Sequence, residues 1–400
     1  MDTKNRTVIL LAACQALMMS SNVLVVASSP LVGMTLAEDK SLASLPLSIQ
    51  LFAGMLMSAP AAFLLEKFGR KRGFMFATLL GMIGAVITTT AIFQENFWLF
   101  VMGVGTLGLF NGFGNYYRFA AADVVDIEHK SRAISYVMIG GVIAAVVGPN
   151  LANWTRMTVD SAPFSFSYGT VLILYILSFI ILGFTNIPKI KHDKESDSWQ
   201  EPRPISQIIM QPRFIVAILS AALGYAVMTL VMTASPLAMQ QHHHNFSDTS
   251  FVIQWHVLGM FAPSFVTGHL IRRFGLNKII FTGVLLGVAC VVINLLGTTV
   301  SHFWWGLLFL GIGWNFLFIG GTTMLTETYH QSERSKTQAM NDVTVFSIAA
   351  TASLSAGMLQ YRFGWEMVNI GALPMLAVIL IALGWLVLKE RSGAVEKALY

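Results

Sequence analysis

The chain has 400 residues, of which 55% are hydrophobic and only 11% are charged. Soluble domains carry about 25% charged residues, so the composition argues against an ordinary soluble enzyme, and long apolar runs decide the matter. The formal net charge is +5, but the positive residues lie in short links between apolar segments, which points to membrane orientation and to no nucleic-acid partner. Cys14 and Cys290 lie within apolar segments and lack metal-ligand spacing, so we expect no metal and no cofactor.

Twelve apolar segments follow one another along the chain, and each is long enough to cross a bilayer. A bilayer offers no partner for free backbone groups, so each segment should be helical. The sequence therefore predicts an all-α membrane protein with twelve transmembrane helices. The expected spans are 8–34, 45–65, 74–93, 97–122, 133–153, 165–187, 214–239, 249–271, 279–298, 303–326, 339–360 and 365–388.

The positive charges follow the alternation of the links. If both termini face inward, 21 of the 25 Lys and Arg residues lie on the inner side. Only Lys40, Arg156 and Arg362 fall outside, and Arg118 lies within the fourth segment. This asymmetry predicts an integral protein of a bacterial inner membrane with cytoplasmic termini.

The two halves of the chain resemble each other in register. Several short matches keep one offset of 206 residues: Ser29-Pro30-Leu31 with Ser235-Pro236-Leu237, Phe68-Gly69 with Phe274-Gly275, and Phe97-Trp98 with Phe303-Trp304. A constant offset indicates two tandem six-helix units in the same orientation. We therefore expect halves at 1–187 and 214–400, joined by a cytoplasmic linker at 188–213.

The link after the second segment reads Ala62-Phe-Leu-Leu-Glu66-Lys67-Phe-Gly69-Arg70-Lys71-Arg72. It resembles the signature loop of the major facilitator superfamily, Gly-x-x-x-Asp-Arg-x-Gly-Arg-Arg/Lys. The second half repeats it as Gly268-His-Leu-Ile-Arg272-Arg273-Phe-Gly275-Leu-Asn-Lys278, with Arg272 replacing the acid. The resemblance spans helix number, tandem halves, linker and loop. It implies the major facilitator fold and a secondary transporter working by alternating access.

The resemblance also implies a latch on the inner side. Glu66 can face a helix N-terminus of the other half, and Arg70 can bind a carboxylate at the end of helix four, with Asp123 and Asp126 as candidates. Alternatively, these cations only set the topology. We place Arg272 with this latch, and expect Glu327 to serve as a gate or latch carboxylate.

Arg118, near the inner end of helix four, is the remaining gating candidate. It can snorkel or pair with Asp123, or it can bind an anionic substrate.

Polar groups near the middle of a membrane are costly and therefore indicate a cavity. The candidates converge on the helices that the family uses to line its central cavity: Asn22, Gln50, Asn111, Asn115, Tyr225, Gln254, Trp255, His256, Trp314 and Asn315. Each has a structural alternative. An Asn can bridge two helices, Trp255 can belong to an interfacial aromatic belt, and His256 can be a neutral buried histidine, a substrate ligand or a proton carrier.

The nearly uncharged, amide-rich and aromatic candidates favour a neutral or weakly charged, planar organic solute as the partner. A proton gradient is the default energy source, and we expect the protein to be a monomer. No phosphate-binding loop and no nucleophile–base pair appear, so we expect neither ATP-driven transport nor an enzyme.

Gly148-Pro149 is similar to a motif of exporters and hints at export. The stretch 253–265 is loosely similar to vitamin permeases, including riboflavin carriers, which gives an uptake alternative; a non-transporting sensor is another.

Overall fold

A computed structural model describes residues 3–187 and 203–398, and the part it describes contains helices and turns but no strand. The predicted all-α architecture is therefore confirmed. The helices are α1 (Thr3–Leu36), η1 (Lys40–Leu42), α2 (Leu45–Phe68), α3 (Arg70–Phe93), α4 (Phe97–Gly114), α5 (Tyr117–Val124), η2 (Ile127–His129), α6 (Lys130–Thr155), α7 (Ser165–Gly183), α8 (Ile205–Ile209), α9 (Pro212–Gln241), α10 (Phe246–Phe261), α11 (Ser264–Phe274), α12 (Leu276–Leu296), α13 (Val300–Thr326), η3 (Gln331–Glu333) and α14 (Arg334–Ala398).

These helices make twelve crossings. Ten continuous stretches of the described chain are long and apolar enough to span a membrane. The pair α10 and α11 makes one more, because each is too short alone and they follow each other around Ala262 and Pro263. The twelfth comes from α14, which counts once among the ten stretches but contains two helices separated at Gly364, whose φ is 79°. The expected single helix at 249–271 is thus interrupted, and the one at 97–122 contains a turn at 115–116, between α4 and α5.

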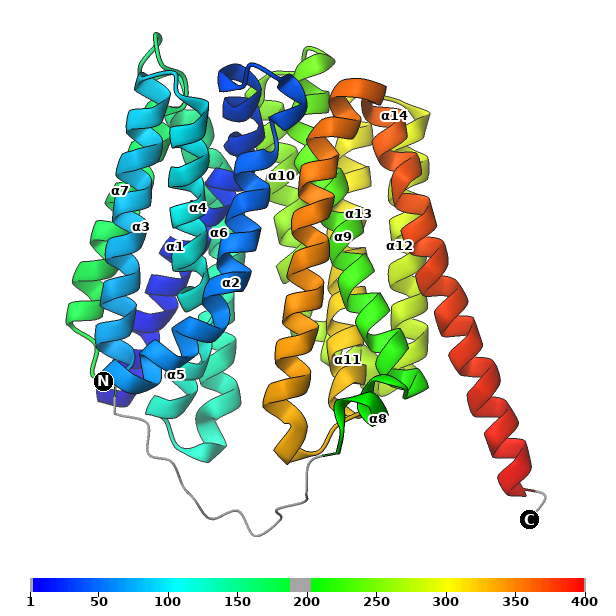
Figure 1. The fold of residues 1–400 in the computed structure, drawn as a ribbon. Helices are drawn as coiled ribbons and strands as arrows, with labels where there is room; N and C mark the ends of the chain where they lie inside the picture. Colours follow the sequence, from blue (N-terminus) through cyan, green and yellow to red (C-terminus); the bar gives the residue numbers. More distant parts are fainter. Residues whose placement is uncertain (1–2, 188–202, 399–400) are drawn as a thin grey trace.

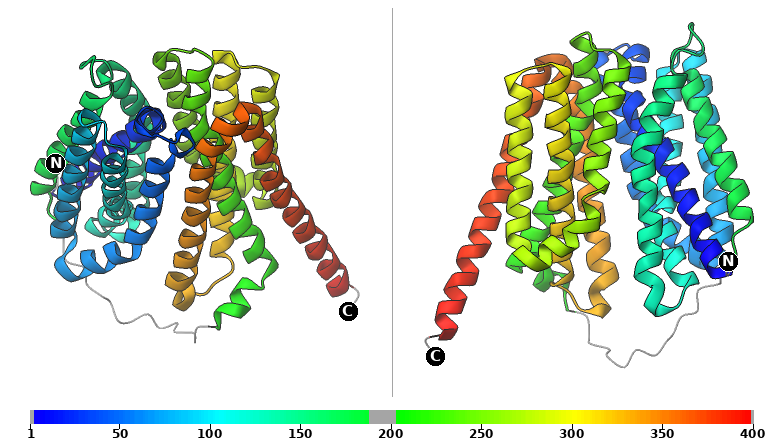
Figure 2. Two further views of the ribbon diagram at one scale, coloured as in Figure 1. Left: turned by 45° about the horizontal axis from the view of Figure 1, so that its top comes forward. Right: turned by 180° about the vertical axis from the view of Figure 1, so that it is seen from behind.

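The helices form two groups that stand side by side (Figure 1). One large apolar cluster draws nearly all its residues from 208–386, and another draws most of its residues from 8–182. Both chain ends lie at the same end of the molecule, and the views from above and behind show the same two groups (Figure 2). We call this end the linker side and the opposite end the far side. Part of the predicted linker, residues 188–202, lies outside the described residues.

The two signature loops have the same backbone conformation. Gly69 and Gly275 adopt φ values of 84° and 87°, in the left-handed region that glycine tolerates at no cost. A Cβ atom at either position would meet nothing within 4 Å. The backbone angle, rather than space, therefore explains the glycine in each loop. It allows α2 to turn directly into α3, and α11 into α12.

Two other glycines bring the cavity helices close together. A Cβ on Gly108 of α4 would lie 2.3 Å from the carbonyl oxygen of Gln50 in α2. A Cβ on Gly311 of α13 would lie 2.4 Å from the carbonyl oxygen of His256 in α10. Gln50 and His256 are separated by the repeat offset of 206 residues, so both halves use the same close helix approach at this depth.

Candidate substrate cavity

Three side-chain amides from three helices meet in the N-terminal half. The Nε2 group of Gln50 and the Nδ2 group of Asn111 each donate to Asn22 Oδ1, at 3.1 Å in both cases. The remaining acceptors, Gln50 Oε1 and Asn111 Oδ1, are buried and have no hydrogen-bond partner among the described residues. A buried acceptor without a partner costs about 1–3 kcal/mol. This amide cluster is therefore suited to accept hydrogen bonds from a bound solute.

The amide cluster lies where the two halves meet. Around Asn22, the side chains of Met19, Val23 and Val26 pack into the apolar cluster of the C-terminal half. On α2, Gly54 lies beside Asn111, since a Cβ there would be 4.0 Å from the Asn111 Cβ. The next residue, Met55, contacts Ser347 Oγ of α14 at 3.1 Å.

An aromatic wall stands in the C-terminal half. Trp314 stacks on Phe318 with ring centroids 5.1 Å apart and planes 8° apart. Tyr225 packs edge-on against Trp314 at 5.5 Å and against Phe346 at 5.7 Å, and Phe261 lies 6.3 Å from Trp314. The Trp314 Nε1 group is buried and has no acceptor among the described residues. The wall thus offers flat apolar surfaces and one unused donor.

Two contacts place the aromatic wall beside the N-terminal half. Phe346 directly precedes Ser347, the residue that touches Met55. Phe261 approaches Gly141 of α6, where a Cβ would lie 3.0 Å from the ring. Hydrogen-bonding amides and stacked aromatic rings therefore occupy the two sides of one interface, an arrangement that suits a planar polar solute.

Several predicted cavity residues have other surroundings. Asn315 is fully buried, accepts from Thr267 Oγ1 at 2.7 Å, and donates to Met260 O at 2.6 Å and Ser264 Oγ at 2.7 Å. These bonds brace the break between α10 and α11. The Asn315 amide is therefore engaged by groups of the C-terminal half in this conformation.

His256 is also fully buried, and its Nδ1 lies 2.7 Å from Leu307 O. A carbonyl oxygen can only accept, so Nδ1 carries the proton in the neutral ring and Nε2 is left as an acceptor. Nε2 has no partner among the described residues. In this conformation His256 is packed between α10 and α13, away from solvent.

Three further predicted cavity residues lie outside the amide cluster and the aromatic wall. Gln254 Oε1 accepts from Asn150 Nδ2 at 2.7 Å, which joins α10 to α6 across the interface. Trp255 packs against Trp304 at 5.8 Å in a cluster with Phe251, which is exposed. Asn115 is exposed at the end of α4.

On the linker side, the predicted latch residues form contacts within halves. Arg70 makes an ion pair with Asp123. Lys4 instead engages Asp126 at 2.9 Å, and its hydrogen bonds lower the pKa of that carboxyl. Glu66 and Arg272 lie exposed in the last turns of α2 and α11.

The C-terminal half has its own ion pairs. Glu327 pairs with Arg213 at 2.5 Å, and Arg213 also reaches Glu390 at 2.9 Å. Arg203 binds the buried Glu333 through both carboxylate oxygens, at 2.8 and 2.7 Å. Glu333 and Asp126 thus play similar parts, because Asp126 binds Lys4 in the first turn of α1 and Glu333 binds Arg203 just before α8.

The halves are held together differently at their two ends. Towards the far side, Ser44 Oγ accepts from Gly357 N at 3.1 Å and donates to Leu354 O at 3.2 Å. On the linker side, no hydrogen bond or ion pair joins the halves between described residues. Arg118 and Asp342 are both exposed and attract each other from opposite halves without pairing. Among the described residues, the hydrogen bonds that join the two halves thus lie away from the linker side.

Sequence reasoning missed several residues of this region. Asn150, Phe318 and Phe346 were not selected, and the first of these was available as an amide within a predicted helix. Its partner Gln254 is 104 residues away, and only the packing of α6 against α10 identifies the pair. Phe318 and Phe346 look like ordinary lipid-facing aromatics in sequence, which gives no signal of a cavity wall.

Comparison with known proteins identifies the class. The Major Facilitator Superfamily model matches residues 9–314 and 217–399, so the chain belongs to this family of transporters. It is 41% identical over 391 residues to the riboflavin transporter RfnT of Brucella anthropi, covering 98% of each chain. It is 27% identical to the MFS-type transporter YddS of Bacillus subtilis, covering 88% of this chain and 84% of that one.

Solved structures show the same fold at lower identity. The nucleoside transporter NupG superposes with a TM-score of 0.71 at 16% identity, covering 96% of this chain and 99% of that one. A bacterial homologue of the lysosomal transporter Spinster gives a TM-score of 0.70 at 15% identity, covering 96% of both chains. The chain is therefore a membrane-embedded transporter of the major facilitator fold, and the predicted family is confirmed.

Proposed function

We propose that this protein carries riboflavin, or a closely related planar heteroaromatic solute, across the membrane by alternating access. The observation that carries the proposal is the pairing of the amide cluster with the aromatic wall. An imide edge offers an N–H donor to Gln50 Oε1 or Asn111 Oδ1, and the ring system can stack on Trp314 or Tyr225. The 41% identical riboflavin transporter supports the same substrate.

The uncharged character of this cavity supports the substrate class. The amide cluster and the aromatic wall offer neutral hydrogen bonds and ring contacts, and the exposed Arg118 belongs to neither set. A fixed cation would favour phosphorylated flavins, because a phosphate group requires charge-assisted hydrogen bonds. The proposed cargo is therefore the free vitamin rather than its nucleotide forms.

We also propose the membrane arrangement. The linker side would face the cytoplasm of a bacterial inner membrane, because 21 of the 25 Lys and Arg residues lie there by sequence. The two halves, 1–187 and 214–400, would rock as rigid bodies around the interface at Asn22 and Trp314. A single chain contains both sides of the cavity, which supports a monomer as the working unit.

For energy coupling we propose the proton, with Asp342 as its carrier. Asp342 is exposed on α14 opposite Arg118, and it is the carboxylate that faces a cation of the other half. Protonation removes its charge and so weakens the attraction across the inner opening. Asp342→Asn should therefore leave solute exchange intact but abolish accumulation driven by a pH gradient; accumulation by this variant would rule out Asp342.

Direct binding tests the substrate assignment. Purified protein in detergent should quench riboflavin fluorescence on binding, since stacking on indole provides a quenching partner. Trp314→Ala should weaken binding by about 5- to 150-fold, because base–aromatic stacking is worth about 1–3 kcal/mol. Trp304→Ala is the matched control, as Trp304 belongs to the cluster with Trp255. Equal binding by both variants, or none by the native protein, would contradict the assignment.

A further inference from the structure

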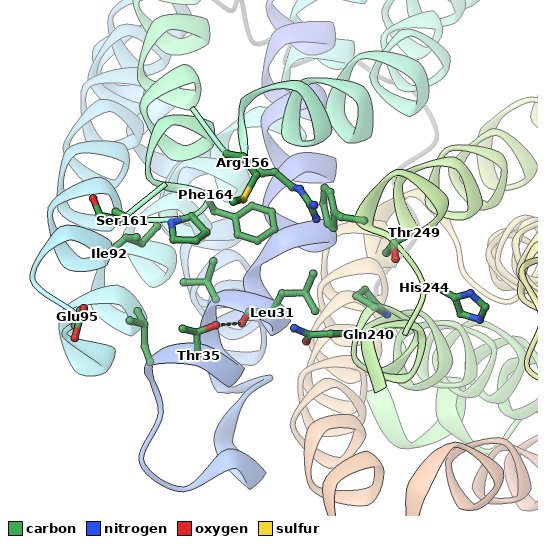
Figure 3. A pocket seen from close by; sticks show the side chains of 17 residues that line it. Leu31, Thr35, Ile92, Glu95, Arg156, Ser161, Phe164, Gln240, His244 and Thr249 are labelled. Carbon is green, nitrogen blue, oxygen red and sulfur yellow. Dashed lines mark hydrogen bonds between the residues drawn. The ribbon is translucent and has the colours of Figure 1, made fainter. Parts of the chain in front are cut away.

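A cavity lies on the far side, separate from the amide cluster and the aromatic wall. Its volume is about 470 Å³, which falls in the range of small-molecule sites. Both halves contribute, with Leu31, Arg156 and Phe164 from one and Gln240, Phe246 and Thr249 from the other. Figure 3 shows Arg156 and Phe164 extending from the N-terminal half towards the Gln240 and Thr249 side. We call it the outer cavity.

The outer cavity combines a cation with two aromatic rings. The Arg156 guanidinium lies 5.3 Å from the centre of the Phe246 ring. Phe164 packs edge-on against the same ring at 5.0 Å. Within residues 3–187 and 203–398, Arg156 makes no side-chain hydrogen bond or ion pair. Its five N–H donors thus remain available to a carbonyl-bearing solute.

The backbone at this cavity is strained where it presents Phe164. This residue has a φ of 66° directly before α7, a conformation that bulky side chains rarely adopt. The backbone N–H of Phe164 donates to the backbone oxygen of Arg156 at 2.7 Å, so the turn holds these two residues close together. Strain of this kind, typically about 1–3 kcal/mol, gathers at ligand clamps and switch regions. Glu95, also at positive φ, lines the cavity, but at a helix end where this conformation is common.

From these observations we infer that the outer cavity is a second binding site, at which a planar aromatic solute with carbonyl groups stacks on Phe246 and is anchored by Arg156. The solute would be the one proposed for the central cavity, so the inference rests on that proposal. The site would hold the solute on the far side while the path between the halves is closed there. Phe164 and Phe246 would form its floor and separate when the halves rock.

Thiol protection from outside the cell tests this site. Cys14 and Cys290 are fully buried, so Gln240→Cys gives a single reactive thiol at the exposed edge of the outer cavity. Riboflavin added to intact cells should slow its reaction with a membrane-impermeant maleimide. Arg156→Gln should raise the half-protecting concentration about fivefold, the loss expected for one cation contact at a partly exposed site. Phe246→Leu should do the same through lost stacking.

The control is Arg362→Gln, which removes another far-side cation that does not line the cavity and should change nothing. An unchanged labelling rate without riboflavin shows that a variant has kept the cavity's shape. Equal protection in Arg156→Gln, Phe246→Leu and the parent would overturn the site.

The result also separates this inference from the proposed function. Riboflavin exchange in proteoliposomes without protection of Gln240→Cys overturns the outer site and leaves the proposed function standing. Protection without exchange supports the outer site and contradicts riboflavin transport. Absence of both refutes both.

Discussion

Replacing Asn111 with leucine should impair solute binding while leaving the fold intact. Asn22 Oδ1 accepts two hydrogen bonds, one from Gln50 and one from Asn111, each at 3.1 Å. Asn111→Leu removes one donor, and Asn22 keeps the other. The substitution also eliminates the unpartnered acceptor Asn111 Oδ1. Folding therefore leaves no new polar group unsatisfied, and leucine keeps the number and branching of the side-chain heavy atoms of asparagine.

The substitution should lower the affinity for the solute. One neutral hydrogen bond contributes about 1 kcal/mol net, and an unpaired donor on the solute costs up to about 3 kcal/mol. Binding should therefore weaken by about 5- to 100-fold. Asn22→Leu is the contrasting variant, because it strips the acceptor from both Gln50 and Asn111 and leaves two donors without partners. It should lower the unfolding free energy by about 2–6 kcal/mol, at 1–3 for each donor.

The assay pairs thermal unfolding in detergent with riboflavin binding on the same samples. Asn111→Leu should melt with the native protein but bind weakly, whereas Asn22→Leu should melt early. Native binding by a normally folded Asn111→Leu would refute the role of the amide cluster in solute recognition and leave Asn111 as a bridge between α4 and α1.

Further predictions concern residues outside the amide cluster. Arg70→Ala should insert and fold but slow transport in proteoliposomes, because it removes the ion pair with Asp123; a native rate would reduce Arg70 to a topology signal. Glu333→Ala should lower the melting temperature, since it removes a buried carboxylate that binds Arg203 through both oxygens, and an unchanged melting curve would contradict this. His256→Gln should keep both transport and its pH dependence, because the ring is fully buried; loss of gradient-driven accumulation with retained exchange would identify His256 as the proton carrier.

Sequence reasoning reached the fold because membrane helices have a strong local signal. Apolar length defines the spans, and the repeated Gly69 and Gly275 loops revealed both the register of the halves and the turn that the structure shows. The interruptions within helices were harder to predict from the sequence. The segment 249–271 is long enough to be a single helix, and the bonds from Asn315 to Met260 and Ser264 explain how its interrupted backbone is supported.

The amide cluster was partly visible in the sequence. Asn22, Gln50 and Asn111 were selected because membrane amides are costly, and the same logic equally selected Asn315, whose partners lie in a neighbouring helix. Composition cannot distinguish an amide that binds a solute from one that braces a helix. The outer cavity gave no signal in the sequence, because Arg156 is one of three cations expected on the outer side and its aromatic partner is 90 residues away.

The central claim is that the chain transports a planar vitamin across the membrane and binds it between the amide cluster and the aromatic wall. Counterflow in proteoliposomes tests it most directly, because exchange needs no knowledge of the coupling ion or the direction of transport. Vesicles loaded with unlabelled riboflavin should take up labelled riboflavin transiently with the native protein and much less with Asn111→Leu or Trp314→Ala. Uptake no greater than in empty vesicles, or equal uptake by all three proteins, would contradict the account.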